Sequence, residues 1–149
     1  MNIGFSATRY GMTVLQIDRL RPMMLPGSIF HHGDCIGGDQ QADTIAAELG
    51  IVRAAHPGIV APRWRANCRT EYRYTPEQPL VRNQIIADCS RVVICCPFEM
   101  APPKPRKGGT WYTIMYAAHK GIRTLVILPN GTLWLATVHV RDLVFQGLD

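Results

Sequence analysis

The sequence lacks the features that mark several large classes of protein. No apolar run approaches the ~18 residues that a membrane-spanning helix requires, and residues 1–5 contain no basic segment leading into an apolar stretch. We therefore expect no signal peptide and no membrane partner. Charged residues make up only 18% of the chain against 47% hydrophobic residues, a balance that excludes a disordered chain. A cytoplasmic protein is the expectation, and its five cysteines should be free thiols.

Several catalytic and cofactor motifs are also missing. Neither the dinucleotide fingerprint G-x-G-x-x-G nor the phosphate loop G-x-x-x-x-G-K-[ST] occurs, which argues against a standard NAD site, an ATPase and a kinase. His31, His32, Asp34 and Cys35 form a group of possible metal ligands, but adjacent strand residues face opposite ways, so the two histidines do not point at one site. No C-x-x-C or H-E-x-x-H pattern accompanies them, and we expect no metal and no cofactor.

The chain is basic, with 16 Lys and Arg against 11 Asp and Glu and a formal net charge of +5, which suggests an anionic ligand. Its 149 residues favour a single domain spanning 1–149. Hydrophobic spacing and turn signals predict strands that alternate with helices. The predicted strands are 1–6, 28–32, 51–56, 91–97 and 123–128, and the predicted helices are 12–24, 40–49, 80–89 and 110–120.

This alternation predicts an α/β sandwich with a parallel sheet. The apolar segments 91–97 and 123–128 are typical of strands covered on both faces. Residues 57–79 form an irregular, proline-rich stretch, and a loop of this length usually covers or builds a site. The tail, 132–149, fits a further strand pair or an edge strand followed by a short helix.

The strand-to-helix loops are candidate binding segments, because ligands of parallel α/β sheets bind at the carboxyl ends of the strands. Three of them, 4–9, 32–39 and 107–111, are rich in glycine and small polar residues. Glycine allows a ligand close to the backbone, and free amides at a helix start attract phosphate, although glycine is also common in plain turns. Together with the start of the helix 80–89, these loops supply the candidate ligand-binding residues Ser6, Thr8, Arg9, Gly33, Asp34, Gly37, Gly38, Arg82, Asn83, Lys107, Gly108, Gly109, Thr110 and Trp111.

Four residues in or beside these segments have competing interpretations. Arg82 either faces the sheet edge and pairs with a phosphate or carboxylate, or is an exposed helix-start residue. Trp111 either stacks on a base or belongs to the core. Asp39 and Glu99 are the candidate catalytic carboxylates. Asp39 is otherwise explained as the N-cap of the helix 40–49, and Glu99 as the partner of a nearby basic residue.

Four segments together resemble the SLOG superfamily, the Rossmann-like group that includes the LOG phosphoribohydrolases and the DNA-processing protein A fold. They are S-A-T-R at 6–9, H-G-D-C-I-G-G-D-Q-Q-A-D at 32–43, R-N-Q-I-I-A-D-C-S at 82–90 and K-G-G-T-W-Y-T at 107–113. The resemblance covers about residues 1–131. It implies a small stand-alone member with a three-layer sandwich, a mainly parallel five-stranded sheet and a nucleotide-type ligand at its carboxyl edge. It also implies a homo-oligomer, a dimer or higher.

The chain departs from the LOG enzymes at one motif. Those enzymes cleave the N-glycosidic bond of a nucleoside monophosphate with the motif P-G-G-x-G-T-x-x-E, in which Gly and Thr hold the phosphate and Glu acts at the ribose. Here the segment 107–113 keeps the Gly-Gly-Thr run but has no Pro, and Tyr112 and Thr113 stand where acidic residues would be. The departure keeps the phosphate cradle and removes the expected carboxylate.

The leading hypothesis is therefore a protein that binds a nucleotide or nucleotide-derived small molecule as a sensor, carrier or sequestering protein. The first alternative is a nucleotide N-glycosidase or related phosphoribohydrolase-like hydrolase that uses Glu99 and Asp39. The second is a DNA-binding protein, but the arginines are scattered and no aromatic stripe alternates with them, so nucleic acid is not the expected partner. A small α/β domain whose glycine loops are only turns is the purely structural alternative.

Overall fold

The computed structural model describes residues 1–105 and 108–149. In this part of the chain four α-helices and two short 3-10 helices accompany one eight-stranded sheet, so the protein has an α/β fold. Each predicted strand and helix is present, with ends shifted by a few residues. The elements are β1 (Asn2–Ala7), α1 (Val14–Leu20), η1 (Arg21–Met23), β2 (Ile29–His32), α2 (Gly38–Glu48), β3 (Val52–Ala55), η2 (Pro62–Trp64), β4 (Tyr72–Arg73), α3 (Pro79–Asp88), β5 (Val92–Cys96), α4 (Gly109–His119), β6 (Arg123–Ile127), β7 (Leu133–His139) and β8 (Asp142–Gly147).

The sheet is mixed, with the strand order β4-β3-β2-β1-β5-β6-β7-β8. The strands from β4 to β6 in this order pair in parallel, whereas β7 is antiparallel to β6 and β8 to β7. The expected count of five strands is therefore wrong. The short β4 lies in the stretch 57–79. The tail forms the strand pair β7–β8, the first of the two arrangements that fit its sequence.

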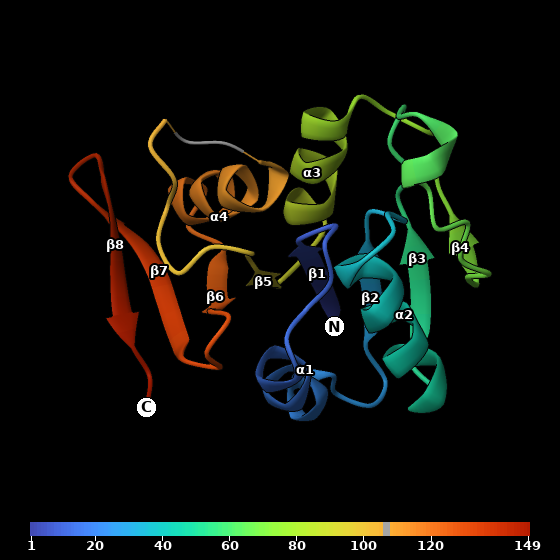
Figure 1. Cartoon of the computed structure of the whole chain (residues 1–149), viewed down its shortest axis with the longest axis horizontal. Helices are drawn as coiled ribbons and strands as arrows, with labels where there is room; N and C mark the ends of the chain where they lie inside the picture. Colours follow the sequence, from blue (N-terminus) through green and yellow to red (C-terminus); the bar gives the residue numbers. More distant parts are fainter. Residues whose placement is uncertain (106–107) are drawn as a thin grey trace.

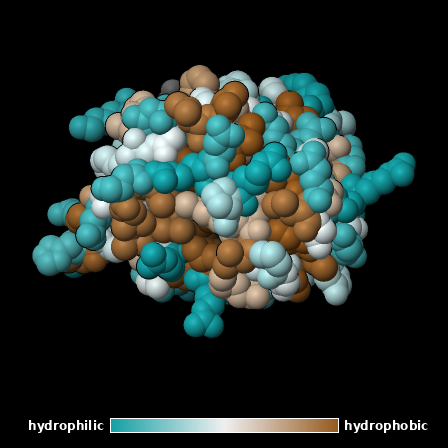
Figure 2. Space-filling model, turned by 90° about the horizontal axis from the view of Figure 1, so that it is seen from below, coloured by the Kyte–Doolittle hydropathy of each residue, from teal (hydrophilic) through white to brown (hydrophobic). Residues whose placement is uncertain are grey.

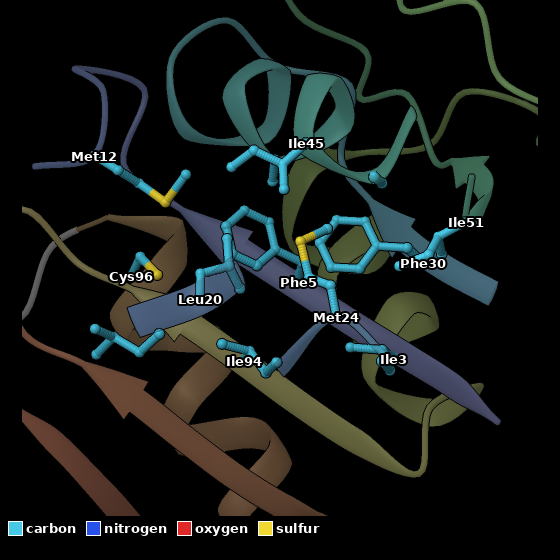
Figure 3. Close-up of a cluster of buried hydrophobic side chains, with 13 residues drawn as sticks. Ile3, Phe5, Met12, Leu20, Met24, Phe30, Ile45, Ile51, Ile94 and Cys96 are labelled. Atoms are coloured by element: carbon cyan, nitrogen blue, oxygen red, sulfur yellow. The ribbon is translucent and has the colours of Figure 1, made fainter. Parts of the chain in front are cut away.

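Helices cover both faces of the sheet, with α1 and α2 on one side and α3 and α4 on the other (Figure 1). The side chains of β5 alternate between two apolar cores, because Ile94 and Cys96 point to one face while Val93 and Cys95 point to the other. The first core lies between the sheet and helices α1 and α2 (Figure 3). The second is shared with α3 and α4. Burial on both faces explains why β5 is apolar throughout.

The two helices of the first face begin differently. Thr13 caps α1 in a capping box, in which its hydroxyl accepts from the Gln16 amide and the Gln16 side chain accepts from the Thr13 amide. The N-cap of α2 is Gly37, with φ +83°, so the prediction that Asp39 caps this helix is wrong. Asp39 lies within the first turn, and its carboxylate is turned back toward the preceding loop.

Apolar side chains also reach the surface. Val14 and Leu15 of α1 are 71% and 54% exposed, and Val140 at the β7–β8 turn is 85% exposed. On the face seen in Figure 2, hydrophobic areas are separated by hydrophilic side chains. Within the described residues no helix is long and apolar enough to cross a membrane. The homo-oligomer stays a prediction.

Candidate functional site

A cavity of about 500 Å³ opens at the carboxyl ends of β1, β2 and β5. We call it the strand-end cavity. Its walls come from the loops that follow these three strands, from the stretch after β3 and from the first turns of α2, α3 and α4. The chain leaves β1 and β5, which are neighbours, in opposite directions across the sheet, and open α/β sheets hold their ligands at such a switch point. The volume lies in the range of roughly 300–1,000 Å³ that small-molecule sites occupy.

The structure brings most of the predicted site residues to this one cavity. Both candidate catalytic residues and ten of the fourteen candidate ligand-binding residues line it: Asp39, Glu99, Ser6, Thr8, Arg9, Gly33, Arg82, Asn83, Gly108, Gly109, Thr110 and Trp111. Three others, Asp34, Gly37 and Gly38, are not part of the wall. The last, Lys107, lies outside the described residues, as does its neighbour Arg106.

The N-terminus of α4 forms one end of the cavity. Gly108 is the N-cap, with φ +88°, a conformation that side-chain-bearing residues rarely adopt. A Cβ on the next residue, Gly109, would lie 3.0 Å from Asn83 Nδ2, so the loop passes close to α3. Thr110 follows in the first turn, with its side chain almost buried against the cavity. The first amides of a helix have no partner within the helix, and together with the helix dipole they favour an anion here.

Arg82 is a buried cation in the cavity wall, with 7% of its surface exposed. Its Nη1 donates to the carbonyl oxygens of Gly33 and His56, and its Nε donates to Asn83 Oδ1 at 2.7 Å. These oxygens take three of the five guanidinium hydrogens. Among the described residues, Nη2 has one hydrogen-bond partner, the Cys35 sulfur at 3.8 Å. The Nη2 group therefore keeps its capacity to bind an oxyanion from the cavity.

Asp39 places a carboxyl group beside this cation. Its Oδ2 accepts from the backbone amides of Gly33, at 3.1 Å, and Cys35, at 3.3 Å. Its Oδ1 is buried and has no hydrogen-bond partner among the described residues. Burial raises the pKa of the Asp39 carboxyl above its usual range, while the charge of Arg82 acts in the opposite direction. An orphaned buried oxygen in a cavity wall is suited to a ligand that donates a hydrogen bond.

The glycines between β2 and α2 allow close packing. A Cβ at Gly33 would lie 2.5 Å from Arg82 Nη1 and 2.9 Å from Asp39 Oδ2, so only glycine leaves room for both side chains. A Cβ at Gly37 would lie 2.3 Å from the Arg9 carbonyl oxygen, and one at Gly38 would lie 2.3 Å from the Ala7 Cβ. Gly37 and Gly38 thus bring the loop after β1 against the start of α2 and do not face the cavity.

Asp34 has a structural role that differs from the expected one. It is 1% exposed and has a positive φ of 56°. Its Oδ1 accepts from the Cys68 amide and its Oδ2 from Arg73 Nη2, both at 2.8 Å. Both oxygens are therefore used to hold the stretch 57–79 against the sheet edge.

Glu99 follows β5 directly and is held by Trp111. Its Oε1 accepts from the indole Nε1 at 3.1 Å, so its partner among the described residues is an aromatic N–H. The basic neighbours Arg106 and Lys107 lie outside the described residues, so a basic partner for Glu99 stays a prediction. Trp111 is only 3% exposed and packs in the second core, which favours the core interpretation over base stacking. The indole nevertheless fixes a carboxylate at the cavity wall.

Four aromatic residues at the cavity were not among the predicted site residues. They are Phe5, which is fully buried, and Tyr10, Trp64 and Phe98. The rings of Tyr10 and Phe98 lie 5.3 Å apart. Tyr10 and Phe98 are 71% and 59% exposed, which is unusual for large aromatic side chains. The Arg9 guanidinium lies over the Trp64 ring, 4.5 Å from its centroid. Trp64 belongs to the stretch 57–79, which does contribute to the cavity as the sequence predicts.

No family model, no curated protein and no solved structure matches this chain. The similarity to the SLOG superfamily therefore stays a prediction that rests on the four sequence segments.

Proposed function

We propose that the protein binds a nucleotide or nucleotide-derived small molecule in the strand-end cavity. The observation that carries this proposal is the juxtaposition, at one switch point of the sheet, of the α4 N-terminus, the buried Arg82 cation and the unpartnered Asp39 oxygen. A ligand with both an anionic group and a hydroxyl group satisfies all three, and a phosphorylated ribose is such a ligand.

The phosphate is assigned to the α4 end of the cavity. The amides after Gly108 and the Thr110 hydroxyl offer neutral donors, and backbone amides at a helix start are a recurrent phosphate cradle. Arg9 lines the same cavity from the loop after β1. Two carboxylates, Asp39 and Glu99, share the wall with Arg9 and Arg82, so the wall is not uniformly basic and favours a ligand that combines negative charge with hydroxyl donors.

The ribose is assigned to the Asp39 side. A sugar hydroxyl donating to Asp39 Oδ1 supplies the missing hydrogen bond of that oxygen, and an oxygen of the same ligand accepts from Arg82 Nη2. The exposed rings of Tyr10 and Phe98 offer a surface on which a base stacks.

Calorimetric titration tests this assignment. Nucleoside mono-, di- and triphosphates, cyclic nucleotides and ADP-ribose are titrated into the protein, with inorganic phosphate as the reference. We expect at least one nucleotide to bind more tightly than phosphate, and Asp39→Asn to weaken the ribonucleotide about tenfold, or ~1.4 kcal/mol. The exposed Asp18 offers a matched control, and Asp18→Asn should leave binding unchanged. Failure of the whole panel to bind refutes the proposal.

N-glycosidic hydrolysis is the second candidate, favoured by one observation. Asp39 and Glu99 line the same cavity, and the pKa of Asp39 is raised, as in a general acid. Free base released from the bound nucleotide would be detected by chromatography, with at least hundredfold slower release in Glu99→Gln or Asp39→Asn. Release at an unchanged rate in both variants would rule out these residues, and no release by the wild-type protein would rule out the activity.

A further inference from the structure

A second group of side chains meets on the α3 side of the sheet, outside the strand-end cavity. His31 from β2, His56 after β3 and Cys89 after α3 place their donor atoms within 4.8 Å of one another. His31 Nδ1 lies 2.9 Å from His56 Nε2 and 3.6 Å from Cys89 Sγ. We propose that this trio is a zinc site with two nitrogen ligands and one thiolate.

The hydrogen bonds of His31 prepare it to be a ligand. Its Nε2 lies 3.1 Å from Asn2 Oδ1, an oxygen that only accepts, so Nε2 carries the ring proton. The lone pair at Nδ1 then accepts from His56 Nε2, and a zinc ion would take the place of that proton. Metal-bound histidines usually donate their other N–H to a carbonyl or carboxylate oxygen, which fixes the ring, and Asn2 supplies that partner here.

Ligation requires neutral imidazoles, and burial favours the neutral form of both rings. They are 4% and 3% exposed, and burial lowers the pKa of His31 and brings the pKa of His56 down to about 3. The Tyr74 ring stacks on His56 at a centroid distance of 4.2 Å and holds it in place.

The separations suit a tetrahedral zinc ion. Zinc bonds of ~2.0–2.1 Å to nitrogen and ~2.3 Å to sulfur imply N···N and N···S separations of about 3.3 Å and about 3.6 Å. The separation between His31 Nδ1 and Cys89 Sγ already has this value, and the two ring nitrogens need to part by ~0.4 Å. The donor atoms of His56 and Cys89 lie within 4.8 Å of each other. Three protein ligands leave the fourth position to water, the arrangement typical of an open zinc site.

The binding step conserves protons. Zinc replaces the thiol proton of Cys89, which passes to solvent, and the His56 ring keeps one proton by carrying it on Nδ1 instead of Nε2. One proton is therefore released for each zinc ion bound. Cys89 is the C-cap of α3, where the negative end of the helix dipole favours a cation.

A second trio, His32, Asp43 and Cys68, also has donor atoms within 4.8 Å of one another, but it is not arranged to bind a cation. His32 Nδ1 accepts from the Asp34 amide at 3.0 Å, and His32 Nε2 lies 2.9 Å from Asp43 Oδ1. Arg53 Nη1 takes the other Asp43 oxygen at 2.9 Å. The distinguishing feature is Arg53, whose guanidinium is bonded to one of the would-be ligand side chains and therefore opposes a cation. This trio serves as the internal control.

The test is titration of chelator-treated protein with Zn²⁺ and, separately, with Co²⁺, in the absence of nucleotide, so the outcome does not depend on the proposed function. We expect one zinc per chain, one proton released and a thiolate-to-cobalt charge-transfer band. Cys89→Ser should remove the band and weaken zinc binding at least tenfold, Asn2→Ala should weaken it about 10–100-fold, and Cys68→Ser should change neither. Thermal unfolding of each variant shows whether it is folded.

Three results would overturn the zinc site. They are the absence of stoichiometric zinc binding by the wild-type protein, an undiminished cobalt band in Cys89→Ser, and loss of the band in Cys68→Ser.

Discussion

Replacement of Arg82 by methionine tests how the strand-end cavity is held together. Methionine has a similar length and is apolar, so the variant fills much of the same space without the guanidinium. It removes the bonds to the carbonyl oxygens of Gly33 and His56 and to the Asn83 side chain. Because Gly33 follows β2, His56 follows β3 and Asn83 lies in α3, one side chain joins three segments that build the cavity.

The expected cost follows from these contacts. A hydrogen bond to a charged group contributes ~1.5–3 kcal/mol, and carbonyl oxygens left buried without a partner add to the loss. The variant also removes the desolvation cost of a buried cation, which offsets part of this sum. We expect a net loss of about 3 kcal/mol, which lowers the midpoint of thermal unfolding by about 6–12 °C in a chain of this size.

Thermal and urea unfolding followed by circular dichroism measure this loss. Arg91 is an exposed arginine just after α3, and Arg91→Met should change stability by less than about 0.5 kcal/mol. If Arg82→Met is as stable as Arg91→Met, Arg82 does not anchor the cavity as described.

Two further predictions concern backbone conformation and pH. Gly37→Ala should lower the free energy of unfolding in urea by more than about 2 kcal/mol, because φ is +83° and the new Cβ would lie 2.3 Å from a carbonyl oxygen. The control variant Gly147→Ala, whose new Cβ would have no atom within 4 Å, should be nearly neutral. Equal stability of the two variants would contradict this geometry. In the presence of a chelator, the free energy of unfolding should fall as the pH drops from 6.5 toward 3. The pKa of His56 is about 3 in the folded chain and 6.5 in the unfolded chain, so the unfolded chain binds the proton first as the pH falls. His56 alone contributes a slope of up to ~1.4 kcal/mol per pH unit, and His56→Gln should flatten the profile.

The sequence predicted the alternation of elements well because local patterns determine it. The apolar strand Val92–Cys96 and the helix starts after glycine or proline need only near neighbours to be recognised. The strand count failed where local signals are weak. The two-residue β4 carries no periodicity, and the hairpin β7–β8 is half exposed, so only its pairing with β6 shows that it extends the sheet.

The sequence predicted the place of the candidate site because parallel topology brings the strand-to-helix loops to one edge of the sheet. The roles of individual residues within those loops depend on contacts across the chain. Asp34 and Asp39 lie in the same loop and look alike in the sequence, yet one holds Arg73 and the other keeps an unpartnered oxygen at the cavity. Likewise, no spacing rule relates His56 and Cys89, because they meet only through the packing of α3 on the sheet.

Amide chemical-shift mapping tests the central claim most directly. A nucleotide that binds in calorimetry is added to isotopically labelled protein, and the backbone amides are followed by NMR. We predict that the largest shifts fall on Gly33, Asp39 and the residues 108–111, with smaller shifts at 8–10 and little change in β7 and β8. Saturation with shifts confined to β7–β8 or to the Asp34–Arg73 contact would contradict the assignment of the strand-end cavity as the binding site.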